Sequence, residues 1–202
     1  MRVLAFSDLH MARARAADLL AASREADLVI GAGDFGNMRQ GVAEAMAMLD
    51  GIAAPLVMVP GNNESEAELR AAAPEGAHVL HGTGVEIGGL QIFGLGGGVP
   101  VTPFGSWSWD FTEDEAAALL AGADGADILI SHSPPKGIAD RTSTGHSVGS
   151  TAVRDAIDRV QPRLLVCGHI HDCWGEDVQR GTTRIVNLGP TVNWFDLEGT
   201  AP

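Results

Sequence analysis

The chain has 202 residues and a formal net charge of −13, with 45% hydrophobic and 19% charged residues. This is the composition of an ordinary globular protein, and it excludes an extensively disordered chain. An acidic surface repels polyanions, so we expect neither bulk nucleic acid nor an anionic membrane as a partner. The length suits one domain, which we expect to span residues 1–202.

The two cysteines, Cys167 and Cys173, are too few for a disulfide framework, and we expect buried, inert thiols. Near the N-terminus, the apolar residues 3–6 follow a single Arg2 and precede Asp8. That stretch is too short for a signal-peptide core or a membrane span. We therefore expect a soluble cytoplasmic protein.

Five short aliphatic runs recur along the chain, each bounded by Gly, Pro or Ser. Their length and their continuous apolar character predict strands that are buried on both faces. The runs are residues 3–6, 28–30, 56–59, 128–130 and 164–166.

Helical patterns lie between most of these runs. Residues 12–25 are Ala-rich and predict the first helix. Apolar residues at i, i+3, i+4 and i+7 predict helices over 42–49 and 153–160. The pairs Ser65/Glu68 and Thr112/Glu115 match capping boxes, which open two further helices.

Two regions break this alternation. Residues 77–95 hold short apolar runs separated by glycines and resemble antiparallel strands, and residues 173–187 resemble a hairpin with Gly181 near its turn. The whole pattern predicts a mixed sheet, or two packed sheets, flanked by helices.

Polar residues follow each of the five apolar runs. In α/β sheets, sites form where the carboxyl ends of strands meet, so we expect these side chains to gather at one edge. Gly33, Gly61 and Gly168 each precede one of them directly and allow a sharp turn there. The polar residues are, in chain order, Asp8, His10, Asp34, Asn62, His132, His169 and His171.

Carboxylate, imidazole and amide groups are the ligand types that suit Zn, Mn and Fe. Asp8 and His10 are spaced i, i+2, as are His169 and His171, which points both side chains of a pair the same way. One Asp-x-His or Gly-Asp alone usually marks a surface turn. Seven such residues, each after its own apolar run, predict a metal site.

The motifs Asp8-x-His10, Gly33-Asp34, Gly61-Asn62, His132 and Gly168-His169-x-His171 together resemble those of the calcineurin-like metallophosphoesterases. They span residues 8–171 in the family's order and spacing. The resemblance implies an α/β fold, a β-sandwich flanked by α-helices in four layers (αββα). It also implies a dinuclear site for two divalent metal ions, and Mn, Fe and Zn all suit these ligands.

By this resemblance, Asp34 would bridge the two metal ions. The first would be held by Asp34 with Asp8, His10 and His171, and the second by Asp34 with Asn62, His132 and His169. The implied activity is that of a phosphodiesterase, or a phosphatase for activated monoesters, in which a metal-bridging hydroxide attacks the phosphorus of a small phosphoester substrate. The natural substrate, the metal and the oligomeric state stay open at this stage.

One position departs from the family pattern. The family usually has a His after the Asn of Gly-Asn, where it contacts the scissile phosphate and serves as a candidate acid, but this chain has Asn63. An amide donates hydrogen bonds but cannot act as a general acid, a role that contributes about 10²–10⁴-fold. Asn63 is thus either a phosphate contact or a plain loop residue. Hydrolysis of substrates with poor leaving groups should be slow.

Other residues near these motifs have competing interpretations. His146 lies in the loop after the fourth run and could replace the missing acid, although a solvated loop histidine is the simpler interpretation. Phe104, Trp107 and Trp109 lie in a Gly- and Pro-rich stretch. They could line a substrate cleft, but we favour packing of the loop or a dimer contact.

Two rival functions are considered. Residues 31–36 match G-x-G-x-x-G after a strand, with Asp50 further on, which is formally a dinucleotide-binding signature. Against it, Asp34 would put a carboxylate beside the pyrophosphate. The second rival is a non-enzymatic, metal-binding protein-interaction scaffold of the same fold. Against it, a pure scaffold has no chemical need for the complete set of seven ligand residues.

Overall fold

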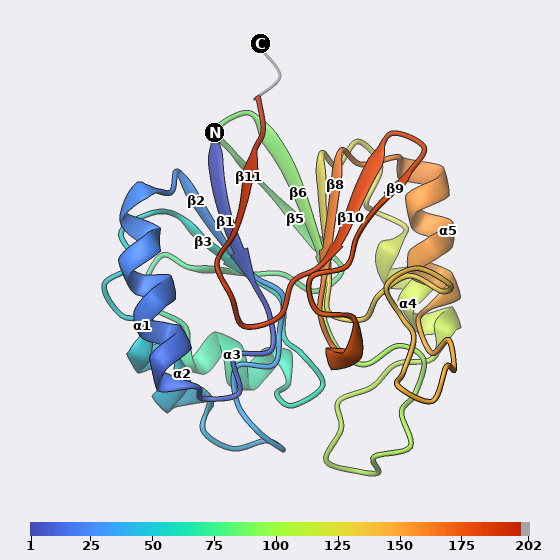
Figure 1. The fold of residues 1–202 in the computed structure, drawn as a ribbon, viewed down its shortest axis with the longest axis horizontal. Helices are drawn as coiled ribbons and strands as arrows, with labels where there is room; N and C mark the ends of the chain where they lie inside the picture. The colour runs from blue at the N-terminus through green and yellow to red at the C-terminus, as the bar shows by residue number, and fades with distance from the viewer. Residues whose placement is uncertain (199–202) are drawn as a thin grey trace.

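The computed structural model describes residues 1–198 of the chain (Figure 1). Two β-sheets pack face to face, and helices cover both outer faces, so the fold has four layers. This arrangement confirms the predicted α/β class with two sheets flanked by helices.

The first sheet has the strand order β11-β1-β2-β3-β4. Its strands run parallel to one another except for β11, which pairs antiparallel with β1 at the sheet edge. The bounds are β1 (Arg2–Phe6), β2 (Leu28–Gly31), β3 (Leu56–Met58), β4 (His78–Val79) and β11 (Asn193–Asp196).

The second sheet has the order β5-β6-β7-β8-β10-β9, with parallel central strands and an antiparallel strand at each edge. The bounds are β5 (Thr83–Ile87), β6 (Leu90–Leu95), β7 (Ile128–Ser131), β8 (Leu164–Cys167), β9 (Asp177–Arg180) and β10 (Thr183–Asn187).

The helices lie on the outer faces of the sandwich (Figure 1). Helices α1 (Arg13–Ala22), α2 (Val42–Met48) and α3 (Glu66–Ala72) cover the first sheet, and α4 (Glu113–Leu120) and α5 (Thr151–Val160) cover the second. Short 3₁₀ turns are η1 (Ser23–Glu25) and η2 (His171–Cys173). Both predicted capping boxes are confirmed, at the starts of α3 and α4.

Strand periodicity explains why the apolar runs are continuous. Val3 and Ala5 of β1 lie in the core between the two sheets, whereas Leu4 and Phe6 lie in the core beneath the helices. Because a strand points successive side chains to opposite faces, a strand covered on both sides needs an apolar residue at every position. The predicted burial on both faces is thereby confirmed.

One of the sequence interpretations needs correction, and one strand was missed. Residues 77–95 do not form one antiparallel set, because β4 pairs parallel with β3 in the first sheet, and only β5 and β6 form an antiparallel pair in the second. The chain crosses between the sheets after β4. Strand β11 was not anticipated. The hairpin within 173–187 is confirmed by the antiparallel pair β9–β10.

None of the helices within residues 1–198 has the length and apolar character that crossing a bilayer requires.

Candidate metal centre

The seven polar residues singled out by the sequence lie at one end of the sandwich. Those that follow β1, β2 and β3 come from the first sheet, and those that follow β7 and β8 come from the second. They form two groups of potential ligand atoms, with Asn62 beside the second group. The site therefore spans both sheets, where the carboxyl ends of their parallel strands meet.

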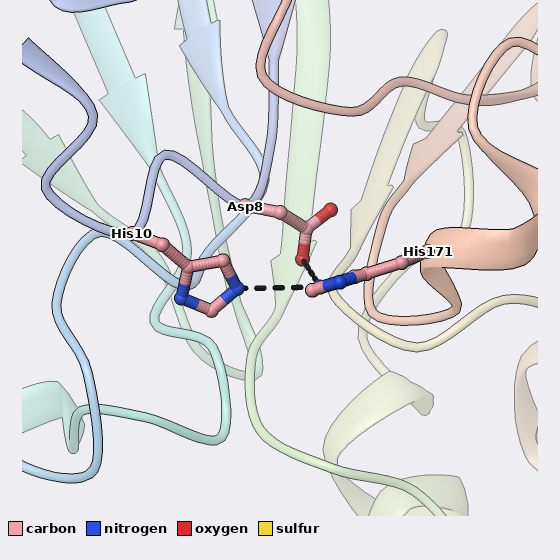
Figure 2. Close-up of side chains that lie close together, drawn as sticks. All are labelled: Asp8, His10 and His171. Atoms are coloured by element: carbon pink, nitrogen blue, oxygen red, sulfur yellow. Dashed lines mark hydrogen bonds and ion pairs between the residues drawn. The ribbon is translucent and has the colours of Figure 1, made fainter.

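The first group consists of Asp8, His10 and His171, whose ligand atoms all lie within 4.8 Å of one another (Figure 2). The two Nε2 atoms of the histidines are 3.2 Å apart. Oδ1 of Asp8 lies 3.7 Å from Nε2 of His171. Asp8 is buried and His171 is exposed, so this group opens to solvent.

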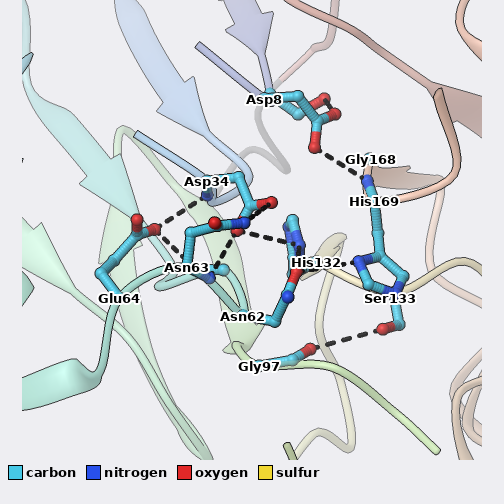
Figure 3. A network of polar contacts seen from close by, with 12 residues as sticks. Asp8, Asp34, Asn62, Asn63, Glu64, Gly97, His132, Ser133, Gly168 and His169 are labelled. Atoms are coloured by element: carbon cyan, nitrogen blue, oxygen red, sulfur yellow. Dashed lines mark hydrogen bonds and ion pairs between the residues drawn. The ribbon is translucent and has the colours of Figure 1, made fainter. Parts of the chain in front are cut away.

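The second group consists of Asp34, His132 and His169, and it is more deeply buried (Figure 3). The amide oxygen of Asn62 lies 3.2 Å from Nε2 of His132 and 3.1 Å from Nδ1 of His169. The Asn62 nitrogen donates to Ser108 Oγ at 2.9 Å, which keeps the amide oxygen turned toward the histidines.

The carboxylate of Asp34 lies between the two groups. Oδ2 is 3.7 Å from Nε2 of His10 in the first group, and Oδ1 is 3.3 Å from Nε2 of His132 in the second. One carboxylate thus offers an oxygen to each side, which is the arrangement that a bridging ligand needs.

Several of these residues have unusual backbone conformations. Asp8, His10, Asp34 and His169 have φ angles of 52°, 44°, 59° and 67°, in the left-handed region that residues other than glycine rarely adopt. Such conformations persist where the surrounding structure fixes them, and they concentrate at functional sites. Here each occurs in the turn that directly follows a buried strand.

The glycines that precede these residues serve two different purposes. Gly33 has a φ of 92°, which fits the predicted sharp turn. Gly61 and Gly168 lie outside the left-handed region, but a Cβ at Gly61 would collide with the Asp34 carboxylate, and one at Gly168 with the Asp8 carboxylate. At these two positions the requirement is close approach and not a turn.

Hydrogen bonds on the outer side of two rings fix which nitrogen faces the site. Nδ1 of His10 is 3.1 Å from the carbonyl oxygen of Gly36, and Nδ1 of His132 is 2.8 Å from that of Ala32. Because a carbonyl only accepts, both Nδ1 atoms donate, and each Nε2 carries a lone pair in the neutral ring.

The donor set fits a metal ion. In the second group, lone-pair atoms of His132, His169, Asn62 and Asp34 converge, and such a cluster needs a cation among them. A proton on His132 meets this need in part: burial alone would lower its pKa, but the charge of Asp34 raises the pKa of His132 to about 9. A divalent ion would take the place of that proton.

The two aspartates are ionised, as metal ligands must be. For both, burial alone would raise the pKa. The neighbouring imidazole of His171, 3.7 Å away, and the charge of His132 outweigh burial at Asp8, and the charge of His132 does so at Asp34, so both carboxyl pKa values lie below the ordinary range.

Asn63 contacts the carboxylate of Asp34, which lies between the two groups (Figure 3). Its backbone nitrogen donates to Asp34 Oδ1 at 2.9 Å, and its side-chain nitrogen donates to Oδ2 at 2.6 Å. Its own Oδ1 accepts from the backbone nitrogen of Met38 at 2.7 Å. Asn63 thereby orients Asp34, which is more than a plain loop residue would do. Its contact with a phosphate stays a prediction.

Glu64 is a buried carboxylate to which the sequence analysis gave no role. It accepts hydrogen bonds from the backbone nitrogens of Asp34 and Gly61, both at 2.8 Å, and from those of Phe35 and Gly36. Burial, followed by the charge of Asp34, raises the pKa of Glu64 to about 7. Glu64 thereby connects the turns after β2 and β3. In the sequence, the only signal for this role was an acidic residue directly after Asn63.

A cavity of about 260 Å³ lies over the two groups. Phe104 and Trp107 line it and stack on each other, with ring centroids 5.6 Å apart and planes at 13°. The two rings therefore pack on each other within their loop, as our preference for loop packing predicted, and also form part of the cavity wall, so their contact with a substrate stays a prediction. Trp109 instead packs against His81 and Phe111, as that preference predicted.

The other sequence candidates lie apart from this cavity. His146 is exposed in its loop, where its backbone bonds to Thr142, and within residues 1–198 it lines none of the walls described for the site. Its role as an acid stays a prediction. The dinucleotide signature lacks its structural context, because α2 begins only at Val42 and Asp50 lies in the exposed turn after that helix.

Trp174 and Ser7 hold Asp8 in place, and the sequence analysis missed both. The indole Nε1 of Trp174 donates to Asp8 Oδ2 at 3.0 Å, and Ser7 Oγ donates to the same oxygen at 2.5 Å. The Trp174 ring also packs on His171 at a centroid distance of 4.3 Å. Neither residue belongs to a motif, so only the fold reveals these contacts.

A comparison with family models agrees with this geometry. Residues 1–173 match the model described as calcineurin-like phosphoesterase. The chain belongs to this family, as its motifs implied.

Curated relatives match part of the chain. The chain is 36% identical over 124 residues to metallophosphoesterase domain-containing protein 1 of Homo sapiens and, to the same extent, of Mus musculus. Each match covers 57% of this chain and 36% of the relative, so the matched segment spans about a third of those proteins. A Caenorhabditis elegans protein, UPF0046 protein T07D4.2, is 30% identical over 119 residues, covering 56% of this chain and 28% of the relative.

Solved structures share the fold at low sequence identity. TT1561 of Thermus thermophilus superposes with a TM-score of 0.76 at 16% identity, covering 96% of this chain and 98% of that one. A dimetal phosphatase from Danio rerio superposes with a TM-score of 0.63 at 14% identity, covering 94% and 88% of the two chains.

Proposed function

We propose that this chain is a two-metal phosphoesterase that hydrolyses a phosphodiester or an activated phosphomonoester. The observation that carries the proposal is the position of Asp34, whose two oxygens face the separate ligand groups at 3.7 and 3.3 Å. Two bound divalent ions would supply Lewis-acid activation of water and of the phosphate. Mn, Fe and Zn all suit these ligands, and we propose manganese for the first assay.

The protein's own residues position these components. Asp8, His10 and His171 would hold one ion on the solvent side, and His132, His169 and Asn62 would hold the other in the buried half. Asp34 would bridge them, fixed by the two hydrogen bonds from Asn63. The substrate phosphate would enter the 260 Å³ cavity, with Phe104 and Trp107 excluding water on one side.

The substrate class follows from what position 63 can do. The Asn63 amide has no acidic proton, and its side-chain nitrogen already donates to Asp34. The leaving oxygen must then depart with little help from this residue, which favours substrates whose leaving groups are stable anions. The net charge of −13 further favours small substrates over polyanions.

The test is hydrolysis of bis(p-nitrophenyl) phosphate and p-nitrophenyl phosphate by the purified chain, with added Mn²⁺ and with chelator. We expect metal-dependent turnover, and the ester that is hydrolysed faster identifies the substrate class. Asp34→Asn should lose activity, whereas Asp50→Asn, at an exposed turn outside the site, should retain it.

The same assay separates the rival interpretations. A chain that binds two metal ions but hydrolyses neither ester, nor a panel of other phosphoesters, would favour the non-enzymatic scaffold. Tight binding of a dinucleotide without any metal would revive the dinucleotide interpretation. Turnover that is unaffected by chelator would contradict the two-metal proposal itself.

A further inference from the structure

A second cavity of about 480 Å³ adjoins the site. It shares the lining residues Phe104 and His169 with the cavity over the ligand groups, so the two cavities are neighbours. Its walls come from the connections that precede α4 and α5 and from the turn after β8. The two helices lie on the same side of the second sheet (Figure 1). The side chains that line it are mostly apolar, namely those of Pro100, Val101, Pro103, Phe104, Val148 and Ile170.

The apolar surface of the protein is concentrated around this site. In residues 1–198 the large hydrophobic side chains classed as exposed are Met38, Val101, Phe104 and Trp174. Val101 and Phe104 line the second cavity, Met38 donates its backbone nitrogen to Asn63, and Trp174 donates to Asp8. Exposed apolar side chains in the wall of one cavity, here Val101 and Phe104, favour a ligand with an apolar part.

The second cavity also contains the sole lysine of the sequence, Lys136. Its backbone nitrogen donates to Ser150 at 2.8 Å and its ammonium donates to the carbonyl oxygen of Ser147 at 2.6 Å, so the side chain is held in place. Within the described residues this ammonium makes that one hydrogen bond and no ion pair, although its charge acts on nearby Asp140. An ammonium carries three donors, so two remain for a ligand.

We infer that the second cavity is the leaving-group subsite, and that it accepts an apolar group bearing a second anion, a carboxylate or phosphate, that pairs with Lys136. The inference rests on the proposed function and narrows its substrate class. Hydrolysis would break the bond between phosphorus and the leaving oxygen. Water would supply the new oxygen on phosphorus and the proton on the departing alcohol.

Charge complementarity supports this assignment. In a chain of net charge −13, a lysine in the wall of a cavity that adjoins the ligand groups is a local exception. A hydrogen bond to a charged group typically raises affinity about tenfold or more. The apolar walls give affinity without selecting for charge, so the two contributions can be measured separately.

The test uses two non-hydrolysable ligands, phenylphosphonate and 4-carboxyphenylphosphonate, titrated calorimetrically into the Mn²⁺-loaded chain. We expect the carboxylate-bearing ligand to bind about tenfold tighter or better. Lys136→Met should abolish that preference while leaving the affinity for phenylphosphonate within twofold, and Lys136→Arg should keep it. Val101→Ser should lower the affinity for both ligands by the same factor.

The control is Arg24→Met, which removes an exposed cation of η1 away from the site and should change neither affinity. Equal affinities for the two ligands in the wild type, or a preference that survives Lys136→Met, would overturn the inference. So would failure of both ligands to bind a metal-loaded chain that hydrolyses bis(p-nitrophenyl) phosphate, and in that case the proposed function would stand. A chain that neither loads metal nor hydrolyses esters would instead overturn the proposed function and, with it, this subsite.

Discussion

The side-chain amide of Asn63 donates a hydrogen bond of 2.6 Å to Oδ2 of Asp34, the carboxylate that lies between the two ligand groups. The backbone nitrogen of the same residue holds the other oxygen at 2.9 Å. Both oxygens of the proposed bridging ligand are therefore fixed by one residue. This residue occupies the position where the family usually has a histidine. Because of its two hydrogen bonds to Asp34, it has a structural role here whether or not it also contacts the substrate.

Removing the side-chain hydrogen bond from Asn63 to Asp34 should weaken metal binding. We expect Asn63→Ala to raise the Mn²⁺ dissociation constants about 10-fold or more, because partners that orient a metal ligand typically contribute that much. Calorimetric titration of the chelator-treated protein measures this. Gln179→Ala, on the edge strand β9, should leave the constants unchanged, because within residues 1–198 that exposed side chain bonds only to the carbonyl oxygen of Gly181. Equal affinities in wild type and Asn63→Ala would show that Asp34 needs no such orientation.

The absence of an acidic proton on Asn63 should appear in the dependence of rate on the leaving group. A series of aryl methyl phosphates whose phenols differ in pKa should give a steep fall in kcat/KM as that pKa rises. Asn63→His should flatten the slope by restoring a proton donor, with a gain of up to about 10²-fold on the poorest leaving groups. A slope that is already shallow in the wild type would show that another group supplies the proton.

Trp174 should affect the solvent-side metal group alone. Trp174→Phe keeps a ring against His171 but removes the 3.0 Å hydrogen bond to Asp8. We expect one of the two Mn²⁺ affinities to fall about 10-fold and the other to stay unchanged. Trp194→Phe on β11 is the matched control, since that ring stacks with Arg2 outside the site. Loss of both affinities would mean that the groups are not independent.

Glu113 links two helix starts on the second sheet. Its carboxylate accepts from Ser150 Oγ at 2.7 Å and from the backbone nitrogens of Thr151 and Ala152 at 2.8 and 2.9 Å, at the start of α5. Loss of this capping interaction in Glu113→Gln should destabilise the fold by about 1–2 kcal/mol at pH 7. Chemical denaturation measures the change, with Glu75→Gln at an exposed turn as control.

The same pair of proteins should show a defined pH dependence. Burial alone would raise the pKa of Glu113, but the hydrogen bonds from Ala152, Thr151 and Ser150 lower it below the ordinary value of 4.5. A carboxyl group whose pKa is lower in the folded state stabilises the fold above its unfolded pKa. The difference in the free energy of unfolding between wild type and Glu113→Gln should therefore be largest above about pH 5. It should shrink as the pH falls below 4.5. A difference that grows in acid would contradict this.

The sequence predicted the ligand positions because local rules determine them. Each ligand follows a strand that contains a continuous apolar run, and parallel strands place their carboxyl ends together. Partners such as Trp174 were not predictable, since its contact with Asp8 joins residues 166 positions apart. The same holds for Ser108, which orients Asn62 from a separate loop.

The errors in the fold have a similar cause. Strand β4 has only two residues, and nothing in the pair His78–Val79 distinguishes parallel pairing with β3 from a hairpin with β5. Strand β11 has polar residues at both ends, and its place is set by antiparallel pairing with β1 at the far end of the chain. Long-range pairing, and not local propensity, decides both.

Metal stoichiometry by inductively coupled plasma mass spectrometry, on Mn²⁺-loaded protein after gel filtration, tests the central claim most directly. The account predicts two ions per chain in the wild type, one in His171→Ala, and fewer than one in Asp34→Asn, because only Asp34 serves both groups. Two ions retained by Asp34→Asn, or a single ion in the wild type, would contradict a bridging role for this carboxylate.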